Sequence, residues 1–224
     1  MPGSSNRLRL EIIRETSAKP LADRHAFLAN NEYRFLAMTQ KILVLTALAS
    51  ELNATVAPAG VDVIYTGVGK VNAASTATAA ILQHQPQLVI NFGTAGKINP
   101  DRDGLLDIAS VIQRDMLAIP LAARGVTPLS DEPSCYTSGH GDACCGTGDS
   151  FVTATDPWLV EQGVDVVDME LFAIAHTCHR YGVSWRAFKF ITDAADDNAA
   201  DHWNDNVHRG ADLFWERLRV ILAA

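Results

Sequence analysis

The sequence predicts an α/β fold with a central, largely parallel β-sheet. Short, continuous apolar runs, of which residues 41–48 (KILVLTAL) are the first, suit strands that are buried on both faces. Glycine-containing turns follow several of these runs and helical stretches separate them, so strand, turn and helix alternate along the chain. A length of 224 residues fits one domain of this kind.

The first half of the chain contains most of this alternation. Residues 1–40 are polar, with a weak helical pattern around 26–38, so we expect a leader or a peripheral helix there and one domain at 41–224. The strand at 41–48 is followed by a second apolar run and then by a helix of small residues that Pro86 closes. The remaining predicted elements of this half are a strand and glycine turn at 61–69, the helix at 70–85, and a further strand and glycine turn at 87–96.

The second half contains one long interruption of the pattern. A strand is expected at 105–112, whereas residues 113–150 are rich in Gly, Ser, Asp and Pro without clear periodicity. A stretch of this length suggests a lid, a loop of the functional site or a partner surface. Regular elements then resume with a strand feeding a helix at 164–182, a strand at 185–197 that ends in carboxylates, and an amphipathic closing helix at 207–224.

Composition excludes several classes of protein. Lys and Arg number 18 against 26 Asp and Glu, and the net charge of -8 argues against a nucleic-acid partner. No run reaches the roughly 20 apolar residues of a membrane span, and the first segment lacks a secretory apolar core. The four cysteines form no C-x-x-C pair, so we expect reduced thiols, a cytoplasmic location and neither a metal nor another cofactor.

Polar residues that directly follow the apolar runs are the first candidates for a site. Ligands of open α/β sheets bind at the carboxyl ends of the strands, where such residues gather. The positions selected by this rule are Glu51, 66–70, 94–96, 149–152, 168–170 and Asp193.

Two of these segments are rich in glycine. The segment 66–70 (TGVGK) matches neither G-x-G-x-x-G nor the Walker A pattern, so a tight strand-to-helix turn is the better interpretation than a phosphate cradle. In 93–96 (GTAG), glycines flank the hydroxyl of Thr94, which would let the backbone approach a ligand. The pattern fits a turn and a binding site equally well.

Three carboxylates also stand out. Asp168 follows an apolar strand and would cap the next helix, whereas Glu170 beside it would accept hydrogen bonds from sugar hydroxyls. Asp193 ends an apolar strand, where burial would raise its pKa and suit it to act as a general acid. A helix cap is the alternative role for Asp193.

Six ordered blocks together resemble one family. KILVLTALASEL, TGVGKVNAA, VINFGTAG, TGDSFV, VVDMELFAIAHTCHRYGV and FITDAADDNAADHW are similar to segments of the 5'-methylthioadenosine/S-adenosylhomocysteine nucleosidases, within the purine nucleoside phosphorylase superfamily. The resemblance runs from Lys41 to the C-terminus. It implies a three-layer α/β/α fold with a mixed sheet, a homodimer, and hydrolysis of the N-glycosidic bond of an adenine nucleoside without a metal or cofactor.

The resemblance also assigns roles to residues. Glu51 would be the base that activates water, and Asp193 would be the acid at N7 of the departing purine. Phe151 would stack on the purine, and the backbone of Val152 would read its edge. The resemblance adds five more substrate-binding residues, with Met169 and Glu170 under the ribose: Thr94, Met169, Glu170, Lys189 and Trp203.

Hydrolysis is expected over phosphorolysis. The phosphorylases that this chain resembles carry an arginine three residues before the Ser or Thr of the glycine loop, because a phosphate dianion needs cationic forks. That position is Asn91 here, and no arginine occurs between Arg34 and Arg102. A nucleosidase for another purine nucleoside, such as futalosine, and a phosphorylase with a different anion site are the alternatives. A binding protein without turnover is a third, which the joint presence of three suitable carboxylates disfavours.

Overall fold

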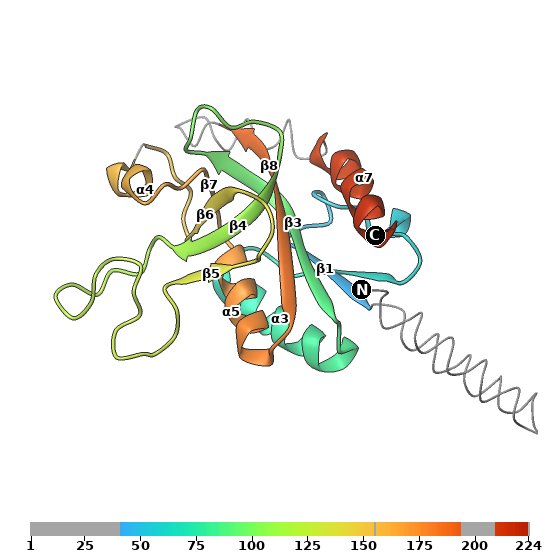
Figure 1. Ribbon diagram of the computed structural model, residues 1–224, viewed down its shortest axis with the longest axis horizontal. Coiled ribbons are helices and arrows are strands. Elements are labelled where there is room, and N and C mark those ends of the chain that lie inside the picture. The colour runs from blue at the N-terminus through green and yellow to red at the C-terminus, as the bar shows by residue number, and fades with distance from the viewer. Residues whose placement is uncertain (1–40, 155, 194–208, 224) are drawn as a thin grey trace, which may run out of the picture. The chain divides into compact units, whose positions relative to one another are not determined.

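The computed structural model describes residues 41–154, 156–193 and 209–223, and Figure 1 shows their arrangement. The leader expected at 1–40 and the predicted site residue Trp203 lie outside the described residues. The strands are β1 (Ile42–Thr46), β2 (Val61–Tyr65), β3 (Leu88–Lys97), β4 (Leu105–Gln113), β5 (Cys135–Thr137), β6 (Ala143–Thr147), β7 (Val166–Asp168) and β8 (Ser184–Asp193). The helices are α3 (Lys70–His84), α4 (Pro157–Glu161), α5 (Leu171–Tyr181) and α7 (Arg209–Ala223), with a 3₁₀ turn, η1, at Ala54–Val56.

The eight strands of the described residues form one mixed, largely parallel sheet, as predicted. Their order is β2-β1-β3-β7-β6-β4-β5, and β8 pairs with both β3 and β4. Pairing is parallel between β1 and β2, β1 and β3, β3 and β8, β4 and β6, and β6 and β7. It is antiparallel between β3 and β7, β4 and β5, and β4 and β8.

Five of these strands close into a ring of hydrogen bonds. β3 pairs with β7, β7 with β6, β6 with β4, β4 with β8, and β8 again with β3. The other three strands extend this ring at its sides: β1 and β2 beyond β3, and β5 beyond β4. Strand β3 is ten residues long, so it can pair with β1 outside the ring and also with β7 and β8 inside it.

Helices lie on both faces of the sheet, which confirms the three-layer α/β/α architecture. In Figure 1, α3 and α5 cover one face and α7 covers the other. The first interface is a cluster of small and branched side chains, with alanines of α3 against α5 and the strands. The second is aromatic, since Phe214 of α7 stacks on Phe92 of β3 at a centroid distance of 4.6 Å.

The predicted glycine turn at 93–96 is wrong, because β3 continues through it to Lys97. The segment pairs with β8, and the register shifts between Ala95 and Gly96. Space is tight at Gly93: a Cβ there would lie 3.2 Å from Lys189 Nζ and 3.5 Å from Glu51 Oε1. Glycines that look like a turn in the sequence therefore mark a close approach of side chains to a strand.

The segment 113–150 is also more regular than predicted. Its last part forms β5 and β6, and β6 lies inside the sheet between β4 and β7. The residues of β6, ACCGT, are small and only weakly strand-like, so their pattern did not indicate a strand. Small residues fit here because a Cβ on Gly146 would lie 3.3 Å from the side chains of Leu159 and Val164.

Candidate active site

A cavity of about 280 Å³ opens where the carboxyl ends of several strands meet. It brings together six of the sequence-predicted site residues with others that follow β1, β2, β4 and β6. Its lining consists of Ala47, Leu48, Glu51, Val68, Thr94, Ala95, Gly96, Arg114, Ser150, Phe151, Val152, Val167, Asp168, Met169 and Glu170. Residues distant in the sequence thus form one site, as the strand-end rule predicts.

Glu51 and Thr94 form the first polar contact of the cavity. Glu51 Oε1 accepts hydrogen bonds from the backbone N of Thr94 at 2.9 Å and from its Oγ1 at 2.8 Å. The other carboxylate oxygen, Oε2, accepts from Thr46 Oγ1 at 3.3 Å and from the backbone N of Leu48 at 3.1 Å. Four donors therefore fix the orientation of a carboxylate that is only 4% exposed.

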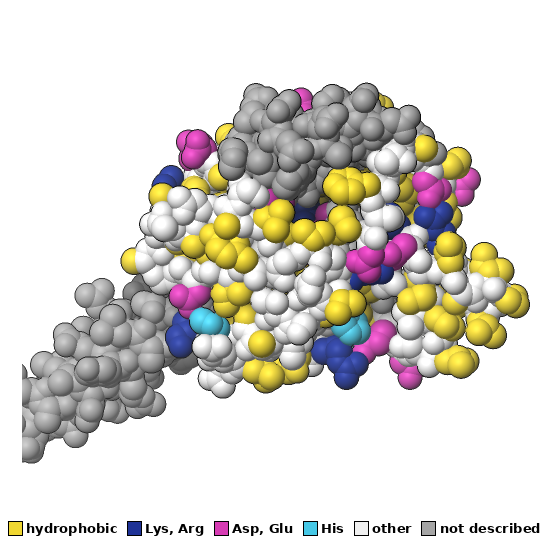
Figure 2. Space-filling model, turned by 180° about the vertical axis from the view of Figure 1, so that it is seen from behind, with side chains coloured by type: hydrophobic (Ala, Val, Ile, Leu, Met, Phe, Trp, Pro, Cys, Tyr) yellow, Lys and Arg dark blue, Asp and Glu magenta, His cyan; other side chains and the backbone are white. Residues whose placement is uncertain are grey.

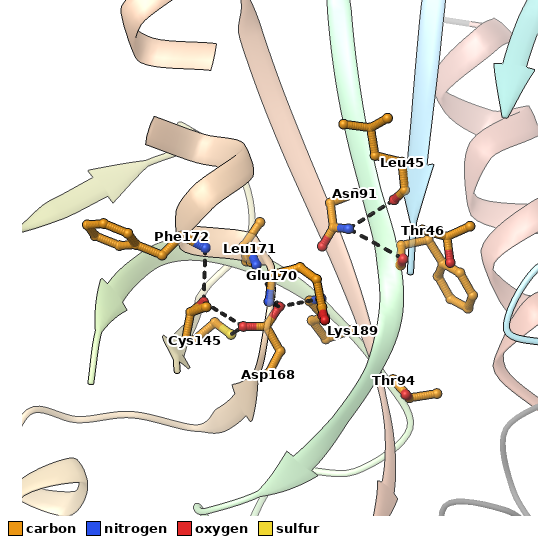
Figure 3. Close-up of polar contacts among 12 residues, drawn as sticks. Leu45, Thr46, Asn91, Thr94, Cys145, Asp168, Glu170, Leu171, Phe172 and Lys189 are labelled. Atoms are coloured by element: carbon orange, nitrogen blue, oxygen red, sulfur yellow. Dashed lines mark hydrogen bonds and ion pairs between the residues drawn. The ribbon is translucent and has the colours of Figure 1, made fainter. Parts of the chain in front are cut away.

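Asp168 and Lys189 form a buried ion pair below the cavity wall, 2.6 Å apart (Figure 3). Lys189 is 1% exposed and does not line the cavity, but its charge also acts on Glu170, whose pKa it lowers. Burial alone would raise the pKa of Asp168 and lower that of Lys189. The attraction between the two charges outweighs burial, so the pKa of Asp168 is lowered and that of Lys189 is raised.

Further contacts of Asp168 anchor the start of α5. Its Oδ2 accepts from the backbone N of Leu171 at 2.8 Å and of Glu170 at 3.3 Å, which confirms the predicted helix cap. Its Oδ1 accepts from Thr147 Oγ1 at 2.5 Å, and Thr147 Oγ1 accepts in turn from the backbone N of Phe172 (Figure 3). Asp168 thus connects β6, β8 and α5.

Glu170 is a carboxylate of the cavity whose pKa is raised. Its side chain is buried, and its Oε1 accepts a hydrogen bond from the backbone N of Gly69 at 2.9 Å. Burial, reinforced by the negative charge of Asp168, raises the pKa of Glu170 to about 7. Lys189 and the Gly69 amide oppose this rise without cancelling it.

The other wall carries the aromatic side chain that the sequence selected. Phe151 lines the cavity and remains 57% exposed, and Val152 follows it. Both belong to the segment after β6. Contacts with Lys70, at the start of α3, help to hold this segment in place. Asp149 Oδ1 accepts from the backbone N of Lys70 at 2.7 Å, and Lys70 Nζ lies 2.5 Å from Asp115 Oδ1.

Arg114 is the lining residue that sequence reasoning missed. It directly follows β4 and is buried, and burial lowers its pKa. Its guanidinium donates to the backbone oxygens of Gly146, Gly148 and Ser150. The strand expected at 105–112 ends within one residue of β4, so the strand-end rule could have selected Arg114, but residues 113–150 were interpreted as one irregular segment and no site residue was sought at its start.

Asp193 ends β8, where its backbone pairs with Gly96 of the cavity wall. Its side chain lies outside the described part of the structure, so its predicted role as an acid stays a prediction. Within 41–154, 156–193 and 209–223, no group of three His, Cys, Asp or Glu residues has the arrangement of a metal site. None of the described helices is both long and apolar enough to span a bilayer.

The sequence profile of the phosphorylase superfamily matches residues 52–116 and 123–224, which is most of the chain. The chain belongs to the phosphorylase superfamily. Among curated members of this superfamily, the 5'-methylthioadenosine/S-adenosylhomocysteine nucleosidase of Marinomonas is 27% identical over 167 residues, covering 61% of this chain and 70% of the relative. The nucleosidase of the same name from Staphylococcus haemolyticus is 28% identical over 155 residues, with coverages of 59% and 68%.

Solved structures of the superfamily share the fold. A mutant of the Helicobacter pylori methylthioadenosine nucleosidase, with 5'-methylthioadenosine in its active site, superposes with a TM-score of 0.74 at 21% identity. That match covers 83% of this chain and 99% of the other chain. The futalosine hydrolase of Helicobacter pylori superposes with a TM-score of 0.71 at 22% identity, with coverages of 82% and 97%.

Proposed function

We propose that this member of the phosphorylase superfamily hydrolyses the N-glycosidic bond of an adenine nucleoside, 5'-methylthioadenosine or S-adenosylhomocysteine. The curated relatives with these substrates in their names support the substrate, and the cavity supports the reaction. Breaking this bond develops positive charge on the ribose and negative charge on the purine. The buried carboxylates Glu51, Asp168 and Glu170 provide an anionic surface for the ribose side of that transition state.

The contact between Glu51 and Thr94 is the observation that supports water, and not phosphate, as the nucleophile of the proposed reaction. A phosphate bound at this strand would need the two Thr94 donors, and the carboxylate of Glu51 already accepts both of them. The carboxylate would also repel a phosphate dianion. Arg114, the cation of the described cavity lining, donates to backbone oxygens and to Ser150 Oγ, so its nitrogens are occupied.

The proposed reaction needs one base and one acid. Glu51 takes a proton from water as the water oxygen bonds to the anomeric carbon, and the bond from that carbon to N9 of the purine breaks. Asp193 donates a proton at N7, so the purine leaves as the neutral base. Acid–base contributions of this kind typically amount to about 100- to 10,000-fold each.

The other predicted residues bind the substrate in this proposal. Glu170 accepts from the ribose 2'- and 3'-hydroxyls, and Met169 packs below the sugar. Phe151 and Val152 bind the purine, and Trp203 flanks the 5'-substituent. Lys189 acts indirectly, because its contact with Asp168 holds the turn that carries Met169 and Glu170.

A homodimer is the proposed assembly. The segment between β4 and β5 exposes hydrophobic side chains: Leu117, Ile119, Leu121, Val126 and Leu129, with Leu129 99% exposed. This segment extends at the left of Figure 1, and hydrophobic side chains gather at the right edge of the opposite view in Figure 2. Exposed apolar patches of this kind are typical of protein interfaces. Among the described residues of that face, Lys and Arg stand beside Asp and Glu.

The decisive experiment is a substrate panel scored for released base with and without phosphate. We expect methylthioadenosine or S-adenosylhomocysteine to yield adenine at the same rate in phosphate-free buffer, with ¹⁸O from labelled water incorporated at the anomeric carbon of the sugar. Release that depends on phosphate and yields a sugar 1-phosphate would refute hydrolysis. Release from futalosine alone would retain hydrolysis and replace the substrate.

Substitution of Glu51 tests the assigned base. We expect Glu51→Gln to lose roughly 100-fold or more in kcat, since general-base catalysis contributes at least that much. Glu161→Gln is the matched control, because Glu161 is an exposed residue of α4. Equal kcat values for Glu51→Gln and the parent would show that another group activates the water.

A further inference from the structure

Every nitrogen of the Arg114 guanidinium donates a hydrogen bond to the segment 146–150. Nε donates to Gly146 O at 3.2 Å, and Nη1 donates to Ser150 Oγ at 3.2 Å. Nη2 donates to Gly148 O at 2.9 Å and to Ser150 O. Backbone oxygens of alternate residues, 146, 148 and 150, therefore all point at one buried cation.

The gripped segment leads directly to the wall of the cavity. Phe151 and Val152 follow Ser150 and line the cavity, as does Arg114. Loop residues usually hold such positions weakly, because few contacts oppose their motion. Here Arg114 replaces the missing sheet partners of residues 148–150 with charge-assisted hydrogen bonds, which are stronger than neutral ones.

Gly148 fits closely against the guanidinium. A Cβ at this position would lie 2.8 Å from Arg114 Cζ and 2.9 Å from its Cγ. Gly148 also donates from its backbone N to Asp168 O at 3.0 Å, so the loop is held from both sides. Glycine is therefore required at 148 for the arginine to reach the backbone.

Arg114 is itself anchored from behind. Its backbone N donates to Thr147 O at 2.8 Å, and its backbone O accepts from Arg124 Nε at 2.7 Å. Arg124 lies over the ring of Trp158 at 4.3 Å from its centroid and pairs with Asp156 at 2.6 Å. The guanidinium thus projects from a backbone that has its own fixed partners.

We propose that Arg114 is a positioning residue that holds residues 148–152 in the conformation in which Phe151 and Val152 meet the purine. Only the part of this inference that concerns the purine rests on the proposed function. The hydrogen bonds by which Arg114 holds the loop do not depend on it. Arg114 does not itself bind substrate, because its nitrogens donate to the loop. Lysine cannot replace it, since one ammonium does not present the planar fork that reaches three carbonyls.

Amide hydrogen exchange in the Arg114→Lys variant tests, without substrate, whether Arg114 holds residues 148–150 in place. We expect the amides of Gly148 and Asp149, which are bonded in the parent to Asp168 O and Asp115 Oδ2, to exchange roughly tenfold faster or more. Arg186→Lys is the control, because Arg186 is a partly buried arginine that pairs with Asp107 at 2.6 Å and does not line the cavity. Unchanged exchange at 148 and 149 in Arg114→Lys would overturn the proposal.

The link to the substrate is tested by kinetics in a double-mutant cycle. We expect Arg114→Lys to raise KM about tenfold with kcat changed less than about threefold, because binding of the purine is lost to a similar extent in ground and transition states. Its effect on KM should be largely absent in a Phe151→Ala background, since both changes remove the same wall. Additive effects of the two substitutions would contradict the proposed route through the loop.

A second variant covers the case in which Arg114→Lys does not fold. Gly148→Ala approaches the same contact from the loop side and places its Cβ against the guanidinium. We expect Gly148→Ala to raise KM and to accelerate exchange of the Asp149 amide in the same way. A KM and an exchange rate equal to those of the parent would contradict the proposed role of Arg114. If the parent releases no base from any nucleoside, the proposed function fails, whereas the exchange experiment still decides the role of Arg114.

Discussion

Glu51 Oε1 accepts both the backbone N–H and the hydroxyl of Thr94, at 2.9 and 2.8 Å. The two residues come from different strands: Glu51 follows β1, and Thr94 lies inside β3. A carboxylate held by a strand in this way has a fixed direction before any substrate arrives. Catalysis benefits from such preorganisation, because no reorientation is needed during the reaction.

Removal of the Thr94 hydroxyl is expected to slow the reaction. Thr94→Val keeps the shape and the backbone donor but deletes one hydrogen bond to Glu51, so kcat should fall about 10- to 100-fold. Thr94→Ser is the control and should remain within a few-fold of the parent, because it keeps the hydroxyl. Steady-state kinetics on the best substrate of the panel provides the measurement, and equal kcat values for the valine and serine variants would contradict the role.

Asp193→Asn is expected to abolish adenine release while substrate still binds. An amide cannot donate the proton that the departing purine needs, so the loss should approach roughly 10,000-fold. A nitrophenyl riboside, whose leaving group needs no proton, should lose far less activity with the same variant. If both substrates lose activity equally, Asp193 is not the acid; calorimetric titration with a nucleoside analogue checks that binding persists.

The KM for nucleoside should depend on pH through Glu170. Burial, together with the charge of Asp168, raises the pKa of Glu170 to about 7, so lowering the pH from 8 to 6 protonates most of it. The protonated side chain is the poorer acceptor for ribose hydroxyls, and KM should rise about tenfold over that interval. Glu170→Gln should flatten this dependence, whereas Glu161→Gln should keep it. A parent enzyme with constant KM across this range would refute the role.

Removal of one partner of the Asp168–Lys189 ion pair should lower the free energy of unfolding. Lys189→Met leaves a buried carboxylate without its cation, and we expect a loss of about 3 to 5 kcal/mol in the free energy of unfolding near pH 7. Because the pair lowers the pKa of Asp168, its contribution is present above the usual pKa of an aspartate and fades as pH falls below it.

Two comparisons make this stability experiment specific. The double variant Asp168→Asn with Lys189→Met should recover much of the loss, since no unpaired charge remains. Lys97→Met is the surface control: Lys97 lies 3.9 Å from Asp103, which is 87% exposed, and its loss should cost less than about 1 kcal/mol. Denaturant unfolding measures all of them, and equal losses for Lys97→Met and Lys189→Met would contradict the ion pair's importance.

Most of the sheet could be predicted from the sequence because its central strands are continuous apolar runs. β1 and β8 follow from their burial on both faces and β4 from its apolar run, and the carboxyl ends of the strands located Glu51, Thr94 and Glu170. The glycines of 93–96 misled the prediction, because a glycine that makes room inside a strand and a glycine in a turn have the same letter.

The remaining differences arise from contacts between distant segments. β6 is made of small residues, and its place in the sheet depends on Leu159 and Val164 packing against Gly146. The raised pKa of Glu170 depends on how closely Asp168 and Lys189 lie to it, which no local pattern contains. The position of Arg114 directly after β4 could be predicted, but its hydrogen bonds to three carbonyl groups about thirty residues away could not.

The ring formed by β3, β7, β6, β4 and β8 also bears on how such a protein can change its substrate. Each strand of the ring is held on two sides, so a shift in one would break the pairing of its neighbours. Four site residues lie on or directly beside these strands: Thr94, Arg114, Asp168 and Asp193. The pairing of the ring therefore fixes their positions relative to one another. New specificity must therefore arise in the segments that leave it, such as the short connection from Glu51 to Val61, where insertions and deletions leave the chemistry in place.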